Sequence, residues 1–223
     1  MNRLLTRVGL WTLPLAGVLV AVPWFVVNGR DGRGISDLTR DPDGFVQWLT
    51  SPMAAAAGYA YLLGLVSLLF GLLALYGLVV DSPAPAWAVL GPLVGIAATA
   101  LLLPLFGVLM LADPVIADVY QAGHKDVIEA LKPLAGGNLA PRLIGYVLVV
   151  SLLALLAAIA SGVALWRSGR VPRWTGVVFA LGFLLCSLSA PLVTPLGALL
   201  VLLSGAGMAL SLRERAATRP ALA

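Results

Sequence analysis

Residues 143–166 of the chain read LIGYVLVVSLLALLAAIASGVALW and contain no Asp, Glu, Lys, Arg or His. A helix rises about 1.5 Å per residue, so this run is long enough to cross a hydrocarbon core about 30 Å thick. A charged side chain at mid-bilayer is costly, and a charge-free apolar run of this length therefore indicates a membrane-spanning helix. The segment predicts a protein that is embedded in lipid.

Four further runs share this property and lie at residues 8–27, 52–80, 82–112 and 174–212. The last run is too long for one crossing, and Pro191 and Pro195 interrupt it, because proline removes a helical hydrogen bond. We therefore predict a single all-α transmembrane bundle over residues 1–223. Its six spanning helices are expected at residues 8–27, 53–80, 86–112, 143–166, 174–190 and 195–212, with outer loops at 28–52 and 113–142.

The composition agrees with a membrane protein. Hydrophobic residues make up 61% of the chain and charged residues 11%, against about 45–50% and about 25% in soluble domains. Folded in water, such a chain would expose more apolar surface than a monomer tolerates. The net charge of +4 is small, and helix orientation accounts for the basic residues, so we predict the lipid bilayer and no nucleic acid as a partner.

Basic residues beside the helix ends indicate the orientation. They cluster between the fourth and fifth spans and in the C-terminal tail, at Arg167, Arg170, Arg173, Arg213, Arg215 and Arg219. Short segments rich in Lys and Arg stay in the cytoplasm, so both termini are expected there. The preference for Arg, Ala and Leu indicates a bacterial cytoplasmic membrane. Arg167, Arg170 and Arg173 are candidate contacts for anionic lipid, because each such residue gains about 1 kcal/mol near it.

A shift of the chain by 87 residues aligns the second and third spans with the fourth and fifth. Gly58-Tyr59 then falls on Gly145-Tyr146, and Gly95 falls on Gly182. Direct repeats of this kind occur in some transporter folds. Two interpretations stay open: a duplicated hairpin, or the shared composition of apolar segments.

The charge-free runs limit the chemistry that the spans can carry. Proton-driven transporters, intramembrane proteases and haem-binding bundles need titratable or ligating side chains at depth. A serine nucleophile would need a nearby base. We therefore predict no enzyme activity, no catalytic residue and no cofactor.

Polar residues in the second outer loop form one candidate site. His124, Asp126 and Glu129 lie close in sequence and are either a partial metal site or the solvated face of a helix. We favour the solvated face and predict no metal, because a second histidine or a cysteine is missing. Short interfacial helices are expected over residues 113–133, starting at Asp113-Pro114, because proline favours the first helical position.

Two functions are compatible with these features. The first is a non-catalytic accessory or interaction protein that binds another membrane protein. The alternative is a carrier or binding subunit for a neutral or lipid-like ligand, whose cavity would be lined by Tyr59, Tyr146 and Ser151.

The loop WRSGRVPRWTG at residues 166–176 resembles a loop of small six-span bacterial inner-membrane proteins of unknown function. The resemblance covers that loop and the general layout of the helices. It implies a six-span bundle and transfers no activity or binding residue to this chain.

Overall fold

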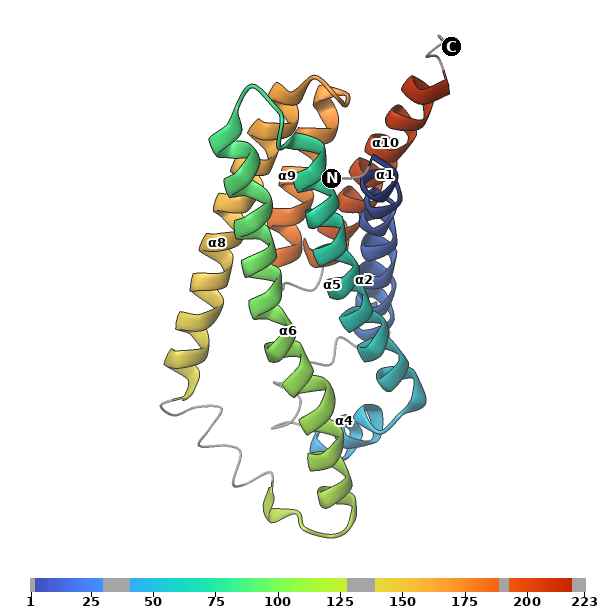
Figure 1. Ribbon diagram of the computed structural model, residues 1–223. Coiled ribbons are helices and arrows are strands. Elements are labelled where there is room, and N and C mark those ends of the chain that lie inside the picture. The colour runs from blue at the N-terminus through green and yellow to red at the C-terminus, as the bar shows by residue number, and fades with distance from the viewer. Residues whose placement is uncertain (1–2, 30–40, 128–138, 189–192, 218–223) are drawn as a thin grey trace.

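The computed structural model of the protein describes residues 3–29, 41–127, 139–188 and 193–217. These residues form helices and the turns that join them (Figure 1). The helices are α1 (Arg3–Leu10), α2 (Thr12–Gly29), α4 (Pro42–Leu49), α5 (Pro52–Val79), α6 (Pro85–Gln121), α8 (Leu139–Ser168), α9 (Arg173–Ser187) and α10 (Val193–Ala217).

The described helices confirm an all-α transmembrane bundle. Five segments are long and apolar enough to cross a bilayer, and they are Val8–Phe25, Pro52–Val79, Pro85–Gly107, Ile144–Ser168 and Val193–Arg215. The fifth predicted span, at residues 174–190, corresponds to α9, which is apolar but has 15 residues. At 1.5 Å per residue, α9 is about 22 Å long and shorter than the hydrocarbon core.

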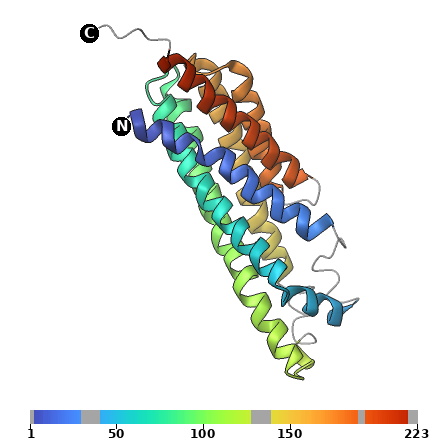
Figure 2. The same ribbon diagram turned by 90° about the vertical axis from the view of Figure 1, so that its right-hand side faces the viewer.

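Among the described helices, α2, α5, α6, α8, α9 and α10 form a closed ring that follows the order of the chain. Helix α2 packs against α5, and the contacts continue through α6, α8, α9 and α10 until α10 returns to α2 (Figures 1 and 2). These helices are therefore neighbours in the bundle in the order in which they follow one another in the chain, as in up-and-down helix bundles. We call the end with the α5–α6 and α8–α9 turns the basic end, and the end with α4 the lobe end.

The first span contains a break at Trp11, between α1 and α2. Pro14 has no backbone N–H to donate to the carbonyl of Leu10, so the helix loses a hydrogen bond at this point. The hydroxyl of Thr12 donates to the carbonyl of Gly9, in the last turn of α1, at 2.6 Å.

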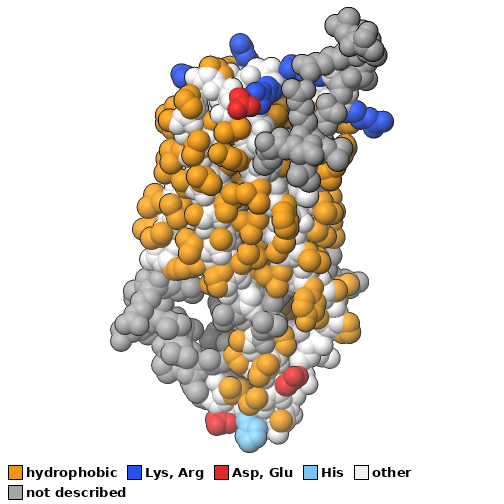
Figure 3. Space-filling view, viewed as in Figure 1, with side chains coloured by type: hydrophobic (Ala, Val, Ile, Leu, Met, Phe, Trp, Pro, Cys, Tyr) orange, Lys and Arg blue, Asp and Glu red, His pale blue; other side chains and the backbone are white. Residues whose placement is uncertain are grey.

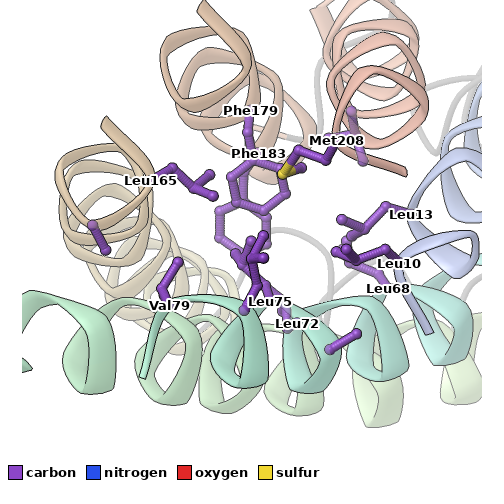
Figure 4. Packing of buried hydrophobic residues seen from close by; sticks show 14 of the residues in the cluster. Leu10, Leu13, Leu68, Leu72, Leu75, Val79, Leu165, Phe179, Phe183 and Met208 are labelled. Carbon is purple, nitrogen blue, oxygen red and sulfur yellow. The ribbon is translucent and has the colours of Figure 1, made fainter. Parts of the chain in front are cut away.

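Apolar side chains fill the interior of the ring toward the basic end. Figure 4 shows Phe179 and Phe183 of α9 pointing at Leu72 and Leu75 of α5. Met208 of α10 closes the same cluster, in which these side chains are almost fully removed from solvent. The interior is thus a packed core.

The outward faces of the same helices are also apolar. On the face drawn in Figure 3, hydrophobic side chains form a belt between the basic end and the lobe end. Over the molecule as a whole, exposed apolar side chains include Leu63 and Phe70 of α5, Leu152 of α8 and Leu203 of α10. A belt of this kind contacts the hydrocarbon of the bilayer and would be unstable in water.

Glycines bring neighbouring backbones into direct contact. A Cβ atom added to Gly91 of α6 would lie 2.5 Å from the backbone nitrogen of Ser161 in α8. One added to Gly17 of α2 would lie 2.6 Å from the carbonyl oxygen of Ala198 in α10. Small residues serve this purpose in membranes, where helices gain no hydrophobic energy by leaving lipid.

Helix α6 corrects one sequence prediction. A new helix was expected to begin at Asp113-Pro114, but α6 continues through Pro114 to Gln121 and has 37 residues, about 55 Å. Ala117 and Tyr120 are buried against Val46 of α4. This packing lies on one face of the helix and stabilises its continuation past the proline.

The ends of the last hairpin also differ from the expected boundaries. Helix α9 ends at Ser187 where residue 190 was expected, and α10 begins at Val193 where residue 195 was expected. Pro195 is accommodated in the first turn of α10, because backbone N–H groups there have no intrahelical partner. Residues 189–192 lie outside the described residues.

The duplicated hairpin stays a prediction. Its second helices differ in length, with 37 residues in α6 and 15 in α9. The aligned glycines also differ in surroundings, since Gly58 is buried and Gly145 is exposed.

Adding one methyl group at the α6–α8 contact should loosen the ring. We expect Gly91→Ala to destabilise the protein by about 1–3 kcal/mol, because the neighbouring backbone cannot yield. Gly107→Ala is the matched control, since no atom lies within 4 Å of an added Cβ there. Thermal unfolding in detergent measures both variants. Equal stability of the two would contradict the proposed backbone contact.

Candidate functional site

The basic end is built around the turn between α8 and α9. Helix α8 ends at Ser168, and Gly169 follows with a φ of +60°, the left-handed conformation that commonly closes a helix. The hydroxyl of Ser168 accepts a hydrogen bond from the backbone N–H of Arg170 at 3.2 Å. This turn directs Arg170 toward α5.

Arg170 joins the α8–α9 turn to the end of α5. Its Nη1 donates to the carbonyl oxygen of Leu78 at 2.7 Å, and its Nη2 lies 3.3 Å from Oδ2 of Asp81. The last carbonyls of a helix lack intrahelical donors, so the guanidinium satisfies one of them. Arg215 of α10 adds a bond from its Nη1 to the carbonyl of Gly169 at 3.1 Å. Three helices are therefore fastened at this end.

The remaining two arginines of the predicted lipid contact lie at the surface. Arg167 and Arg173 are exposed, and the guanidinium of Arg173 lies 5.6 Å from the centre of the Trp166 ring. The structure thus separates Arg170, which is bonded within the protein, from Arg167 and Arg173. Lipid binding by any of the three stays a prediction.

The lobe end carries a second polar network, in a unit that we call the lobe. The lobe consists of α4, the end of α6 from residue 114 and the turn at residues 122–127. Asp41 caps α4 by accepting a hydrogen bond from the backbone N–H of Gly44 at 3.0 Å. Val46, Ala117 and Tyr120 form its buried core.

Tyr120 connects the two helices of the lobe. Its hydroxyl donates to Oδ1 of Asp43 at 2.8 Å, and Nζ of Lys125 lies 3.9 Å from the same oxygen. The Lys125 ammonium also lies 5.6 Å from the centre of the Tyr120 ring. The pKa of Tyr120 is raised from its usual 10.0, first because the hydroxyl donates to Asp43 and then because packing removes water from it. The charges of Asp43 and Asp41 act in the same direction.

The predicted polar cluster is described only in part. His124 and Asp126 are exposed in the turn that follows α6, and Glu129 lies outside the described residues. Within the described ranges, no three His, Cys, Asp or Glu side chains gather in a group that could hold a metal ion. The solvated helix face that we predicted for the three residues stays a prediction.

The predicted ligand-cavity residues are not brought together. Tyr59 lies on the outer surface of α5 with 61% of its side chain exposed. Tyr146 of α8 is half-buried, and its hydroxyl donates to the carbonyl oxygen of Leu101 in α6. Ser151 is half-buried on α8. No described contact joins Tyr59 to the other two residues, so a shared cavity stays a prediction.

Sequence reasoning missed an aromatic cluster inside the ring of helices, toward the lobe end. The centres of the aromatic side chains of Tyr61 and Phe106 lie 4.6 Å apart, and those of Trp24 and Tyr61 lie 5.8 Å apart. The three side chains come from α5, α6 and α2, and their separations are those of favourable aromatic pairs. Periodicity within one helix does not reveal which aromatic residues meet across helices.

Comparison of the chain with protein-family models, with curated proteins and with solved structures finds no match. The resemblance of residues 166–176 to a loop of six-span bacterial proteins therefore stays a prediction.

Loss of the Arg170 guanidinium should weaken the basic end. We expect Arg170→Gln to lower the free energy of unfolding by about 1–3 kcal/mol, because the Leu78 carbonyl and Asp81 lose a charged donor. Arg167→Gln removes the same charge from an exposed site and should cost less than about 0.5 kcal/mol. Thermal unfolding in detergent compares the two. A larger loss for Arg167→Gln would contradict this role of Arg170.

The Tyr120–Asp43 bond should make the lobe sensitive to alkaline pH. The folded-state pKa of Tyr120 is raised, so its stabilising effect is complete below the unfolded-state pKa of about 10 and is lost as pH rises through the folded-state value. Asp43→Asn should lower the Tyr120 pKa. Tyrosine-selective carbon NMR can follow the titration, with Tyr120→Phe identifying the signal. An unchanged Tyr120 pKa in Asp43→Asn would contradict this assignment.

Proposed function

We propose that the protein is a non-catalytic accessory protein of the bacterial cytoplasmic membrane, which binds another membrane protein through its lobe. The observation that carries this proposal is the mounting of the lobe on α6. This helix runs without a break from the α5–α6 turn at the basic end to Gln121 in the lobe. A continuous helix holds the lobe at a fixed height above the bundle.

Bonds across the lobe support the same interpretation. Tyr120 is bonded to Asp43, and Nε2 of Gln121 lies 3.2 Å from the hydroxyl of Thr50. These bonds, together with the core around Val46, fix α4 to the end of α6. A preformed surface binds a partner with little loss of conformational entropy.

The packed interior of the ring favours a structural role over transport. Large side chains such as Phe179, Leu75 and Met208 meet at its centre (Figure 4). A solute path through the ring would require these side chains to move apart, and dense apolar packing resists such movement.

The orientation proposed for the protein places the basic end in the cytoplasm. Both ends of the described chain, Arg3 and Ala217, lie toward that end (Figure 1). Arg167, Arg170, Arg173, Arg213 and Arg215 lie there too. Short arginine-rich segments favour the cytoplasmic side, and the lobe would then face outward.

Two valines mark the face of the lobe proposed to meet the partner. Val115 and Val119 lie one turn apart on α6, on a side that α4 does not cover. Val115 is 60% exposed. An exposed apolar pair beside polar residues is a common feature of interaction surfaces.

A photo-crosslinking residue at position 115 tests the proposal in living cells. We expect one dominant adduct with another membrane protein, and we expect the same protein to copurify in stoichiometric amount from mild detergent. Leu203, which is 55% exposed on the apolar belt, is the control position. The proposal fails if position 115 gives no adduct and the protein purifies as a lone monomer.

A further inference from the structure

The surface around the α8–α9 turn lies at the level where apolar spans meet water. The span Ile144–Ser168 ends at this turn. Trp166 and Trp174 project outward at the ends of α8 and α9, and both are about half exposed. Indole rings in this position favour the headgroup region of a bilayer, so the turn is placed beside lipid phosphates.

The arginines of the turn differ in what they contact. Arg170 is bonded to Leu78 and Asp81, and Arg215 is bonded to Gly169. These two guanidinium groups therefore already have acceptors within the protein. Arg167 and Arg173 are exposed at the same turn, and no bond to an acidic side chain is described for either of them.

Trp166 positions one of the exposed arginines. The Arg173 guanidinium lies 5.6 Å from the centre of the indole ring, within the range of a cation–π interaction. Arg167 follows Trp166 directly in the chain. Two exposed cationic residues therefore flank the α8–α9 turn, and one of them, Arg173, contacts an aromatic ring that prefers the interface.

The charge near this surface favours an anionic occupant. Asp81 is paired with Arg170, and Glu214 lies next to Arg215 on α10. Arg167, Arg173 and Arg213 add basic charge at the same end, which keeps the surface positive. A phosphate diester can accept paired hydrogen bonds from a guanidinium group, whose planar fork of N–H donors matches two of the phosphate oxygens. Because the indole ring of Trp166 lies at headgroup depth, the phosphate that fits this surface is that of a membrane lipid.

We infer that Arg167 and Arg173 bind the phosphate of one anionic phospholipid, with Trp166 against its glycerol backbone. Arg170 takes no part in this site, because its guanidinium already has acceptors within the protein. The inference does not depend on the proposed partner of the lobe.

Lipid binding by the full-length protein in mild detergent tests the inference. The probe is phosphatidylglycerol, compared with phosphatidylcholine of the same chain length, and native mass spectrometry counts the bound lipid. We expect one phosphatidylglycerol to be retained. The double variant Arg167→Gln/Arg173→Gln should bind it at least about tenfold more weakly, which corresponds to about 1.4 kcal/mol.

Three comparisons separate a specific site from general attraction. The control Arg7→Gln/Arg213→Gln removes two other basic residues, from α1 and α10 at the same end, and should keep phosphatidylglycerol binding. Trp166→Leu leaves the charge unchanged and should weaken retention by a smaller factor. Adding inorganic phosphate should not displace the lipid, because the phosphate ion lacks the acyl chains that anchor it.

Any of three results would overturn the inference. The first is equal retention of phosphatidylglycerol and phosphatidylcholine by the unaltered protein. The second is an equal loss in the Arg7/Arg213 control, which would indicate attraction by net charge alone. The third is unchanged binding in the Arg167/Arg173 variant. The comparison of the two lipids on the unaltered protein applies even if a variant does not fold.

Discussion

Backbone contact at glycines is the interaction on which the rest of the structure depends. Apolar side chains in a bilayer exchange lipid contacts for protein contacts with little gain, so helices must approach closely to profit from dispersion forces. Gly17 provides this approach between α2 and α10, and Gly91 provides it between α6 and α8. Between α9 and α10, a Cβ on Gly182 would lie 2.8 Å from the backbone nitrogen of Val201. Contacts at different interfaces thus hold the ring closed.

The closed ring determines where the polar parts of the chain can lie. The α5–α6 and α8–α9 turns meet at one end because consecutive helices run in opposite directions. Arg170 can therefore reach α5 across a long sequence separation. At the other end, α6 extends past its neighbours and carries the lobe, where Tyr120 meets Asp43 (Figures 1 and 2). The membrane-embedded part supplies the frame, and the two ends carry the polar networks.

The sequence predicted the parts of this structure that follow from local composition. Charge-free runs predicted the spanning helices, because the free-energy cost of placing a charge in lipid depends on the residue type and on its depth. It does not require knowledge of tertiary contacts. The continuation of α6 through Pro114 was not predictable in this way, because it depends on the packing of Ala117 against α4. The same limit applies to the Tyr120–Asp43 pair, which is 77 residues apart in the chain. In the sequence, Arg170 could not be distinguished from Arg167 and Arg173. The left-handed turn at Gly169 directs it toward α5, where it binds the carbonyl oxygen of Leu78.

Nitroxide labels on two cysteine variants test most directly whether hydrocarbon surrounds the ring. With Cys186 replaced by alanine, Phe70→Cys places a label on the apolar belt, and Val115→Cys places one on the lobe. In lipid vesicles, the label at position 70 should collide often with oxygen and rarely with a water-soluble nickel chelate, and the label at position 115 should show the opposite preference. Equal access of the nickel chelate to both labels would contradict the account.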